Sequence, residues 1–181
     1  MTTELHTSRL LLRPFRDSDL EPLVAMGQDP IVMKHFVSLM SREDTVAMVG
    51  RMKDYWEKHG FGVFAVEIPG IHDFVGFVGF TQPRWEATFT PCIEILWRLI
   101  PDAHNKGYCT EAARACLEWG FKEKGFEEIL SFAVPQNIPS WRVMEKIGMK
   151  REGEFEHPLV KEGHHLRKHF IYKIEAGSLL S

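Results

Sequence analysis

The segment from His104 to Ala112 has the residue types of an anion-binding turn. It reads His-Asn-Lys-Gly-Tyr-Cys-Thr-Glu-Ala and joins an apolar run at Ile93–Arg98, which predicts a strand, to a run at Glu111–Lys124 that predicts a helix. The first N–H groups of a helix lack intrahelical partners and lie at the positive end of its dipole, so they can hold a phosphate without cationic side chains. Gly107 would let the chain approach such an anion closely. The order Lys106-Gly107 argues against an ATP-binding P-loop, in which the lysine follows the glycine.

The composition predicts one cytoplasmic domain spanning residues 1–181. Apolar residues make up 44% of the chain, enough to fill a core. With 22 basic and 25 acidic residues the net charge is −3, so bulk electrostatics favour neither nucleic acid nor a membrane surface as a partner. Cys92, Cys109 and Cys116 are an odd, sparse set without a C-x-x-C pair, which is typical of reduced thiols. No signal peptide or run of membrane-spanning length is recognisable.

Periodicity and turn residues predict the elements that position the turn. Ser41, with Asp44 three residues later, resembles a capping box, and Pro69-Gly70 supplies the turn of a hairpin. The expected strands lie within 5–15, 61–68, 74–81, 92–100, 128–134, 149–155 and 167–175, and the expected helices at about 17–27, 41–59, 111–124 and 140–147. This order predicts a mixed α/β fold with a sheet of about seven strands and about four helices.

Two segments together resemble the GNAT N-acetyltransferases. The first is Glu94-Ile95 through the turn at His104–Ala112, and the second runs from Asn137-Ile138-Pro139-Ser140 to Glu145-Lys146-Ile147-Gly148-Met149. The opening Arg9-Leu10-Leu11-Leu12-Arg13-Pro14, the Asn-x-x-Ser start of the late helix and its Lys-x-Gly end are similar to the RimJ/RimL-type subgroup, and the likeness covers nearly the whole chain. The resemblance implies a mostly antiparallel sheet in which one splayed strand pair forms an acetyl-CoA cleft.

The resemblance also implies a cofactor site. The family turn Q/R-x-x-G-x-G/A aligns with residues 104–109, where His104 replaces Gln or Arg and Cys109 replaces a smaller residue. The turn amides would hold the pyrophosphate, the pantetheine arm would pair with the strand edge, and Asn137 would reach the arm from the far side. The implied acetyl-CoA contacts are Leu96, Trp97, Arg98, Leu99, His104, Asn105, Lys106, Gly107, Tyr108, Cys109, Thr110, Asn137 and Ser140.

Acyl transfer to an amine needs a base for the nitrogen and an acid for the leaving thiolate. Glu94 lies where the family often has a carboxylate and is the expected base; the alternative is an ordinary strand glutamate that faces solvent. Met144 occupies the position of the family's usual tyrosine acid, so Ser140 is the nearest replacement, with a helix cap or a coenzyme contact as its alternative role. Cys109 suggests a rival covalent mechanism, because a helix N-terminus lowers a thiol pKa, unless it is a small apolar filler.

Two further groups of residues invite a functional interpretation. Four late histidines suggest a metal site, but no cysteine or fixed carboxylate pattern completes one, so no metal is expected and surface or acceptor-pocket roles are favoured. Four aromatic residues could line an acceptor cavity or belong to the core, with Trp85 the best pocket candidate because it lies in a loop. The histidines are His157, His164, His165 and His169, and the aromatic residues are Trp85, Phe89, Trp97 and Trp141.

The expected acceptor is an α-amino group, such as a protein N-terminus. An α-amine with a pKa near 7.8 is about one-seventh neutral at pH 7, whereas a lysine near 10.4 is neutral in roughly one molecule in 2,500, so the α-amine asks less of its base. Small-molecule amines such as amino acids, polyamines or aminoglycosides are alternatives. A catalytically weak acyl-CoA-binding sensor and a plain interaction module are others. A homodimer could form through exposed sheet edges or the late strands.

Overall fold

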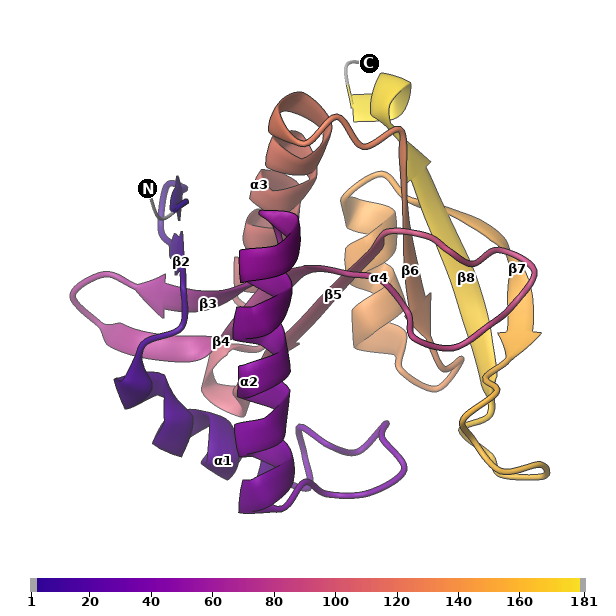
Figure 1. Cartoon of the computed structure of the whole chain (residues 1–181), viewed down its shortest axis with the longest axis horizontal. Helices are drawn as coiled ribbons and strands as arrows, with labels where there is room; N and C mark the ends of the chain where they lie inside the picture. Colours follow the sequence, from indigo (N-terminus) through magenta and orange to yellow (C-terminus); the bar gives the residue numbers. More distant parts are fainter. Residues whose placement is uncertain (1–2, 180–181) are drawn as a thin grey trace.

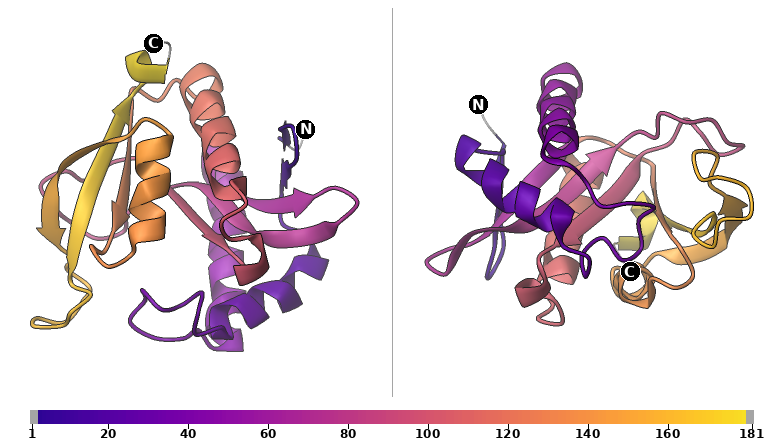
Figure 2. Two further views of the ribbon diagram at one scale, coloured as in Figure 1. Left: turned by 180° about the vertical axis from the view of Figure 1, so that it is seen from behind. Right: turned by 90° about the horizontal axis from the view of Figure 1, so that it is seen from below.

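The structure is a computed structural model that describes residues 3–179, and it contains an eight-stranded sheet with helices on both faces (Figure 1 and Figure 2). The strands follow the order β1-β2-β3-β4-β5-β6-β8-β7, and the β5–β6 pair alone among them is parallel. The predicted mixed α/β fold is confirmed. The strands are β1 (Leu5–His6), β2 (Leu11–Arg13), β3 (Val63–Ile68), β4 (His72–Thr81), β5 (Glu94–Leu99), β6 (Glu128–Ala133), β7 (Lys150–Glu156) and β8 (Lys168–Glu175). The helices are α1 (Leu20–Gln28), α2 (Arg42–His59), α3 (Tyr108–Glu123) and α4 (Ile138–Lys146), with short 3-10 turns at Asp17–Asp19, Pro101–Ala103 and Ala176–Leu179.

The two faces of the sheet carry different helices. α1 and α2 lie on one face, and α3 and α4 lie on the other, as the front and rear views show (Figure 1 and Figure 2). The larger buried cluster, which includes Ile95 and Trp119, packs toward α3, and a smaller cluster that includes Leu23 and Phe77 packs beneath α1 and α2. Because successive strand residues point to opposite faces, β5 directs Ile95 into the larger cluster and Leu96 toward α2. None of the helices within residues 3–179 combines the length and apolarity needed to cross a bilayer.

Local signals place several element ends where they are expected. The Ser41 hydroxyl accepts a hydrogen bond from the Asp44 N–H at 3.0 Å, and the Asp44 carboxylate accepts one from the Ser41 N–H at 3.0 Å, so the capping box at the start of α2 is confirmed. Gly60 ends this helix in the left-handed conformation, with φ 67°. β3 and β4 form the predicted antiparallel hairpin.

Three element boundaries differ from the prediction. α3 begins at Tyr108 rather than Glu111, because Gly107 adopts φ 81° and acts as the N-cap, so the end of the turn becomes the first helical turn. α4 begins before Ser140, because the Asn137 side chain caps the helix and accepts the Ser140 N–H at 3.3 Å. The expected first strand is two short strands, because the Thr7 N–H donates to the Leu10 carbonyl at 3.0 Å and forms a turn. The sheet therefore has eight strands instead of about seven.

β5 and β6 separate after a single register pair, Glu94 with Leu130. At this closed end the Leu130 N–H donates to the Ile93 carbonyl at 2.8 Å, and the Ser131 hydroxyl donates to the Ile95 carbonyl at 2.8 Å. Beyond it the two strands run in different directions (Figure 1). The expected splayed pair is therefore present, and it opens toward the C-terminal end of β5.

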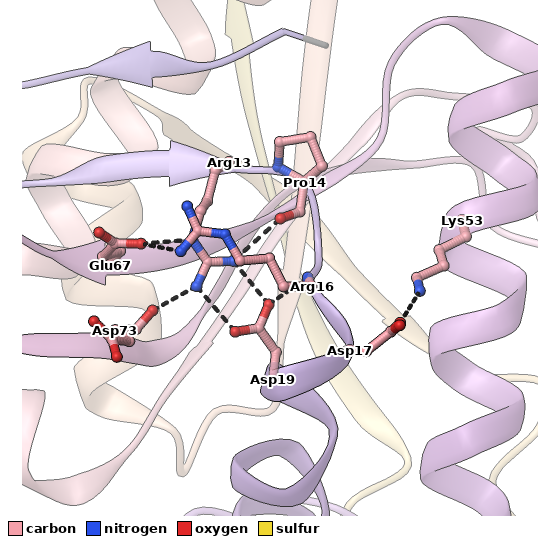
Figure 3. Close-up of polar contacts among 8 residues, drawn as sticks. All are labelled: Arg13, Pro14, Arg16, Asp17, Asp19, Lys53, Glu67 and Asp73. Carbon is pink, nitrogen blue, oxygen red and sulfur yellow. Dashed lines mark hydrogen bonds and ion pairs between the residues drawn. The ribbon is translucent and has the colours of Figure 1, made fainter.

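A buried arginine connects the N-terminal segment to the sheet (Figure 3). The Arg13 guanidinium donates to both carboxylate oxygens of Asp19, at 2.8 and 2.9 Å, and its Nε donates to Glu67 at 2.6 Å. It also donates to the backbone carbonyls of Pro14 and Asp73. The Arg13 and Asp19 side chains are 1% and 2% exposed. Burial removes the hydration of both charges, so each is stabilised by its ion pair with the other. Arg13, the second arginine of the opening motif, therefore has a structural role.

We expect Asp19→Ala to lower the free energy of unfolding by about 3 to 5 kcal/mol, because it leaves the Arg13 charge buried without its bidentate partner. Denaturant unfolding measures the change. Asp17→Ala is the matched control, since Asp17 is fully exposed in its ion pair with Lys53, and we expect it to cost about 0.5 kcal/mol or less. Equal losses in the two variants would contradict a stabilising role for the buried pair.

Candidate active site

The turn before α3 presents unpartnered backbone N–H groups. Asn105 has φ 57° and Gly107 has φ 81°, and these left-handed residues turn the chain sharply before the helix. The Glu111 N–H donates to the Gly107 carbonyl at 3.0 Å, so the preceding amides of Tyr108, Cys109 and Thr110 form the open N-terminus of α3. Residues 104–107 are exposed. This geometry fits the anion-binding turn expected from the sequence. The helix that carries the amides begins three residues earlier than predicted.

An N-terminal arginine supports this turn, and sequence reasoning missed it. The Arg9 Nε donates to Glu111 at 2.7 Å, its Nη1 donates to the Lys106 carbonyl at 2.9 Å, and its guanidinium lies 4.7 Å from the centre of the Tyr108 ring. Desolvation alone would raise the pKa of Glu111, but hydrogen bonds from Thr7 and Arg9 outweigh it and hold that pKa below its ordinary value. Nothing local in the sequence reveals this contact, because the partners lie about one hundred residues apart.

The open edge of β5 lies between this turn and Glu94. The Ile100 N–H donates to Val75 of β4, whereas the Ile95 carbonyl accepts from Ser131 of β6. Because hydrogen-bonding groups of successive strand residues alternate between the two edges, the backbone groups of Leu96 and Arg98 face β4, and those of Trp97 and Leu99 face the gap toward β6. The Leu99 carbonyl is taken by the His104 ring, whose Nε2 lies 2.9 Å away and must donate because a carbonyl only accepts. Of the backbone groups from Leu96 to Leu99, those left free to contact acetyl-CoA are therefore the N–H and carbonyl of Trp97 and the N–H of Leu99.

The first turn of α4 lies across the gap and carries two predicted site residues. Asn137 uses its side-chain oxygen to cap the helix through the Ser140 N–H, and the Ser140 side chain is half-buried. Met144 is completely buried in the larger core cluster, so the position of the family's tyrosine contributes packing and no proton donor. Ser140 thus remains the predicted replacement for the family's tyrosine as the proton donor.

Cys109 does not have the lowered pKa that a covalent mechanism requires. Burial raises the pKa of its thiol far above the ordinary value. A protonated thiol is a poor nucleophile. The structure therefore favours the alternative, a small apolar filler that packs against the larger core cluster, over a reactive thiol.

Glu94 lies at the closed end of the splayed pair. Its side chain is half-buried, and desolvation raises its pKa to about 7. A carboxylate with this pKa is partly ionised at neutral pH and can accept a proton there, which an ordinary surface glutamate does poorly. Perturbed carboxylates of this kind are typical of functional sites. Glu94 is therefore not a fully exposed strand glutamate, and its role as the base stays a prediction.

A cavity of about 140 Å³ lies beside Glu94 on the same face of the sheet. Thr81 is the register partner of Glu94, and Leu96 follows it on the same face of β5; both line the cavity. The remaining wall comes chiefly from α2. The lining residues are Met48, Arg51, Met52, Tyr55, Val63, Phe80, Thr81, Arg84 and Leu96. No local sequence pattern marks Arg51, Tyr55 or Arg84 as site residues.

The loop aromatics expected at an acceptor pocket do not line the 140 Å³ cavity. Trp85 stacks on Phe155 with ring centres 5.4 Å apart, and Phe89 lies 5.3 Å from Phe132, so the loop between β4 and β5 packs over β6 and β7. Figure 1 shows this loop crossing those strands. Trp97 packs against the larger core cluster and Trp141 lines a second cavity, of about 660 Å³, beside α4. Trp85 is half-buried by contacts to β7 and does not line the 140 Å³ cavity, and its place in an acceptor pocket stays a prediction.

The late histidines belong to two separate contacts. The ring centres of His157 and His169 lie 5.1 Å apart, in the aromatic group that contains Trp85 and Phe155. Desolvation and the neighbouring His169 lower the pKa of His157 to about 4. His164 stacks on His165 with ring centres 4.6 Å apart. Within residues 3–179, three or more histidine, cysteine or acidic side chains are nowhere grouped as metal ligands.

These features fit a coenzyme A thioester. The glycine-capped helix N-terminus suits its pyrophosphate, and the open edge of β5 suits an amide-containing arm that adds to the sheet like a strand. At Gly107 an added Cβ would lie 3.2 Å from Arg9 Nη2 in a backbone conformation that other residues rarely adopt. The arm would lead from the turn toward Glu94 and the cavity.

Comparison with known proteins assigns the family. The model of the acetyltransferase (GNAT) domain matches residues 9–150. The chain is 40% identical over 152 residues to the uncharacterized N-acetyltransferase YnaD of Bacillus subtilis (strain 168), an alignment that covers 83% of this chain and 84% of that protein.

Solved structures agree with the sequence comparison. A GNAT-family acetyltransferase from Bacillus anthracis superposes with a TM-score of 0.80 at 34% identity, covering 97% of this chain and 99% of that one. The spermidine N-acetyltransferase of Vibrio cholerae, in complex with CoA and spermine, gives a TM-score of 0.75 and covers 97% of this chain and 100% of that one. Its identity is only 16%, so this likeness shows the fold alone. The chain belongs to the GNAT family and is an acyl-CoA-dependent N-acetyltransferase.

Proposed function

We propose that this enzyme transfers acetyl from acetyl-CoA to an α-amino group by direct attack in a ternary complex, within one domain spanning residues 1–181. The observation that carries the proposal is the continuous path from the glycine-capped N-terminus of α3, along the open edge of β5, to Glu94. The opening motif at residues 9–14 supports assignment to the RimJ/RimL-type subgroup. The alternative acceptors are small-molecule amines.

Acetyl-CoA supplies a thioester that is already activated for acyl transfer. The amides of Tyr108, Cys109 and Thr110 bind its pyrophosphate, and Gly107 keeps the approach free of a side chain. The N–H and carbonyl of Trp97 hold the pantetheine arm in strand-like pairing. Asn137 and Ser140 contact the arm from α4. These contacts orient the thioester toward the face of β5 that carries Glu94.

Glu94 acts as the base, directly or through a water molecule. The amine nitrogen bonds to the thioester carbonyl carbon as the carbon–sulfur bond breaks, and the proton lost by nitrogen passes to Glu94. A pKa of about 7 lies close to the value of about 7.8 for an α-amine, so the proton transfer is nearly matched. A lysine side chain lies about three units higher. This match supports the α-amino acceptor.

The departing sulfur needs a proton from another group. Met144 is buried and has none to give, so Ser140 or solvent supplies it. The same observation favours a second candidate function, a catalytically weak sensor that binds acetyl-CoA without efficient turnover. The two functions differ in whether coenzyme A is released.

A thiol-release screen with acetyl-CoA tests the proposed function. We expect release with peptides that have a free N-terminus, and at least tenfold less with the same peptides blocked at the N-terminus and carrying only a lysine amine, because far less of the lysine amine is neutral. Calorimetry with acetyl-CoA is the parallel measurement. Binding without release from any amine would support the sensor, and absence of both would contradict both functions.

Gly107→Ala should weaken acetyl-CoA binding by roughly tenfold, because the methyl group strains a left-handed residue and narrows the approach to the amides. Calorimetric titration measures the dissociation constant. Gly125→Ala is the matched control: Gly125 has φ 66° and nothing within 4 Å of an added Cβ, so it carries a similar backbone cost away from the site. Equal effects on affinity would show that the loss reflects backbone strain alone.

Glu94→Gln should reduce kcat/KM about 100-fold and remove the limb of the pH–rate profile with a midpoint near pH 7. The limb that belongs to the acceptor amine itself should remain, which separates the two ionisations. Steady-state rates from pH 5.5 to 9 with one acceptor measure both. A profile that keeps the limb near pH 7 would exclude Glu94 as the base.

The same substitution has a second readout in stability. Because the folded pKa of Glu94 is raised from 4.5 to about 7, folding takes up a proton between these pH values, and the native enzyme loses stability as pH rises through that window. The slope is at most about 1.4 kcal/mol per pH unit. Glu94→Gln should remove this slope and be more stable than the native chain at pH 8, so loss of activity would not reflect unfolding.

A further inference from the structure

We propose that the acceptor amine carries an anionic group, a carboxylate or a phosphate, which Arg51 and Arg84 bind at the cavity beside Glu94. The inference rests on the proposed acetyl transfer and names the class of acceptor. Four observations carry it: two arginines without a hydrogen bond or ion pair, the absence of acidic residues from the cavity lining, the shared sheet face with Glu94, and a third arginine without a carboxylate on that face.

Arg51 and Arg84 differ from the other arginines in the part of the chain that the structure describes. Each of the other nine makes a hydrogen bond or an ion pair, such as Arg13 with Asp19. Arg51 and Arg84 make neither, and both are exposed where they line the cavity. Two cations at one cavity that make no hydrogen bond or ion pair leave ten N–H donors for a ligand. Guanidinium groups suit carboxylate and phosphate oxygens in particular.

No side chain of the described cavity lining offsets this charge. The nine lining residues include no aspartate or glutamate. Arg51 interacts electrostatically with Asp44, whose carboxylate is already engaged by the backbone N–H of Ser41 in the capping box of α2. The cavity therefore has a positive mouth over an apolar floor that includes Met48, Met52 and Leu96. Such a site fits a short apolar stem that ends in an anion.

The cavity is joined to the reacting centre through β5 and β4. Leu96 lies two residues from Glu94 on one face of β5, and Thr81 lies opposite Glu94 in the neighbouring strand. An amine whose nitrogen approaches Glu94 would therefore extend the rest of the molecule across Leu96 and Thr81 into the cavity. The anionic group would meet the arginines while the amine remains at Glu94.

A third arginine adds positive charge to the same face of β5. Arg98 lies two residues beyond Leu96, and its guanidinium stacks over the rings of Phe36 and Phe77 at 4.2 and 5.4 Å. Its Nε is buried without a hydrogen-bond partner, and the contact of its Nη1 is the Met40 sulfur at 3.5 Å, so no carboxylate neutralises it. A polycationic amine would be repelled by this group together with Arg51 and Arg84, whereas an anionic amine would be attracted.

Tripeptide amides with a free N-terminus test the inference, because they differ only in the charge of one side chain. The probes are Ala-Glu-Ala, Ala-phosphoserine-Ala, Ala-Gln-Ala and Ala-Lys-Ala amides, with free glutamate and spermidine as small-molecule arms. We expect kcat/KM for the better of the two anionic peptides to exceed that of the glutamine peptide by about tenfold, with the lysine peptide and spermidine poorer still. The glutamate and phosphoserine arms identify which anion the arginines prefer.

The double variant Arg51→Gln, Arg84→Gln should reduce this preference to about one, mainly through a rise in KM for the anionic peptide. Lys53→Gln is the matched control, because it removes one positive charge from α2 at a residue that pairs with Asp17 and does not line the cavity; it should keep the preference. Calorimetric binding of acetyl-CoA to each variant verifies that the chain is folded. If the double variant fails this check, the two single variants replace it, each with a partial loss of preference expected.

Two results would overturn the inference while leaving the acetyltransferase activity intact. One is turnover of the neutral or cationic peptides at a rate equal to or above that of the anionic ones. The other is a preference for the anionic peptide that survives the arginine substitutions. Failure of every amine to release coenzyme A would instead contradict the proposed function itself.

Discussion

A parallel strand pair ordinarily keeps its hydrogen bonds along its length, but β5 and β6 separate after Glu94 and Leu130. The separation leaves backbone groups of β5 without strand partners, and the chain satisfies two of them with side chains, Ser131 at Ile95 and His104 at Leu99. Between these two points the groups of Trp97 face the gap. β5 thus has one short, open edge at Trp97, and the hydrogen bonds at Ile95 and Leu99 lie on either side of it.

The elements at the two ends of this edge perform different tasks. At one end, Gly107 begins α3 in a conformation that exposes the first amides of the helix, and Arg9 fixes the turn through Glu111 and the Lys106 carbonyl. At the other end, the pairing of β5 with β6 closes the gap and places Glu94 beside the cavity. The proposed anion site and the proposed proton acceptor therefore lie at the two ends of β5, and the length of this strand sets the distance between them.

The polar groups around the cavity are energetically costly in isolation. Glu94 is desolvated enough to raise its pKa to about 7, and the Arg98 guanidinium is buried without a carboxylate, which lowers its pKa to about 10. The buried Arg13–Asp19 pair shows that this chain does neutralise a buried arginine where the role is structural. The unneutralised groups on the cavity face fit a surface that meets a charged ligand, because such a ligand supplies the missing partners.

The sequence by itself determined the elements whose signals are local. The Ser41 capping box, the β3–β4 hairpin and Gly107 depend on backbone conformations and hydrogen bonds within a few residues, so their positions could be predicted. The family resemblance added the splayed pair and Glu94. The start of α3 shifted by three residues, because Gly107 adopts φ 81° and caps the helix, so that residues 108–110 form its first turn.

Only the tertiary structure decided the contacts and charges that join distant residues. The Arg9–Glu111 bridge links residues about 100 positions apart, and the packing of Trp85 on Phe155 links residues about 70 positions apart. No local pattern encodes either contact. The pKa of Cys109 moved opposite to the expectation because it depends on burial as well as on helix position. The meeting of Arg51 and Arg84 at one cavity likewise arises from the packing of α2 against the sheet, since the energy of a buried or unpaired charge is set by neighbours that only folding brings together.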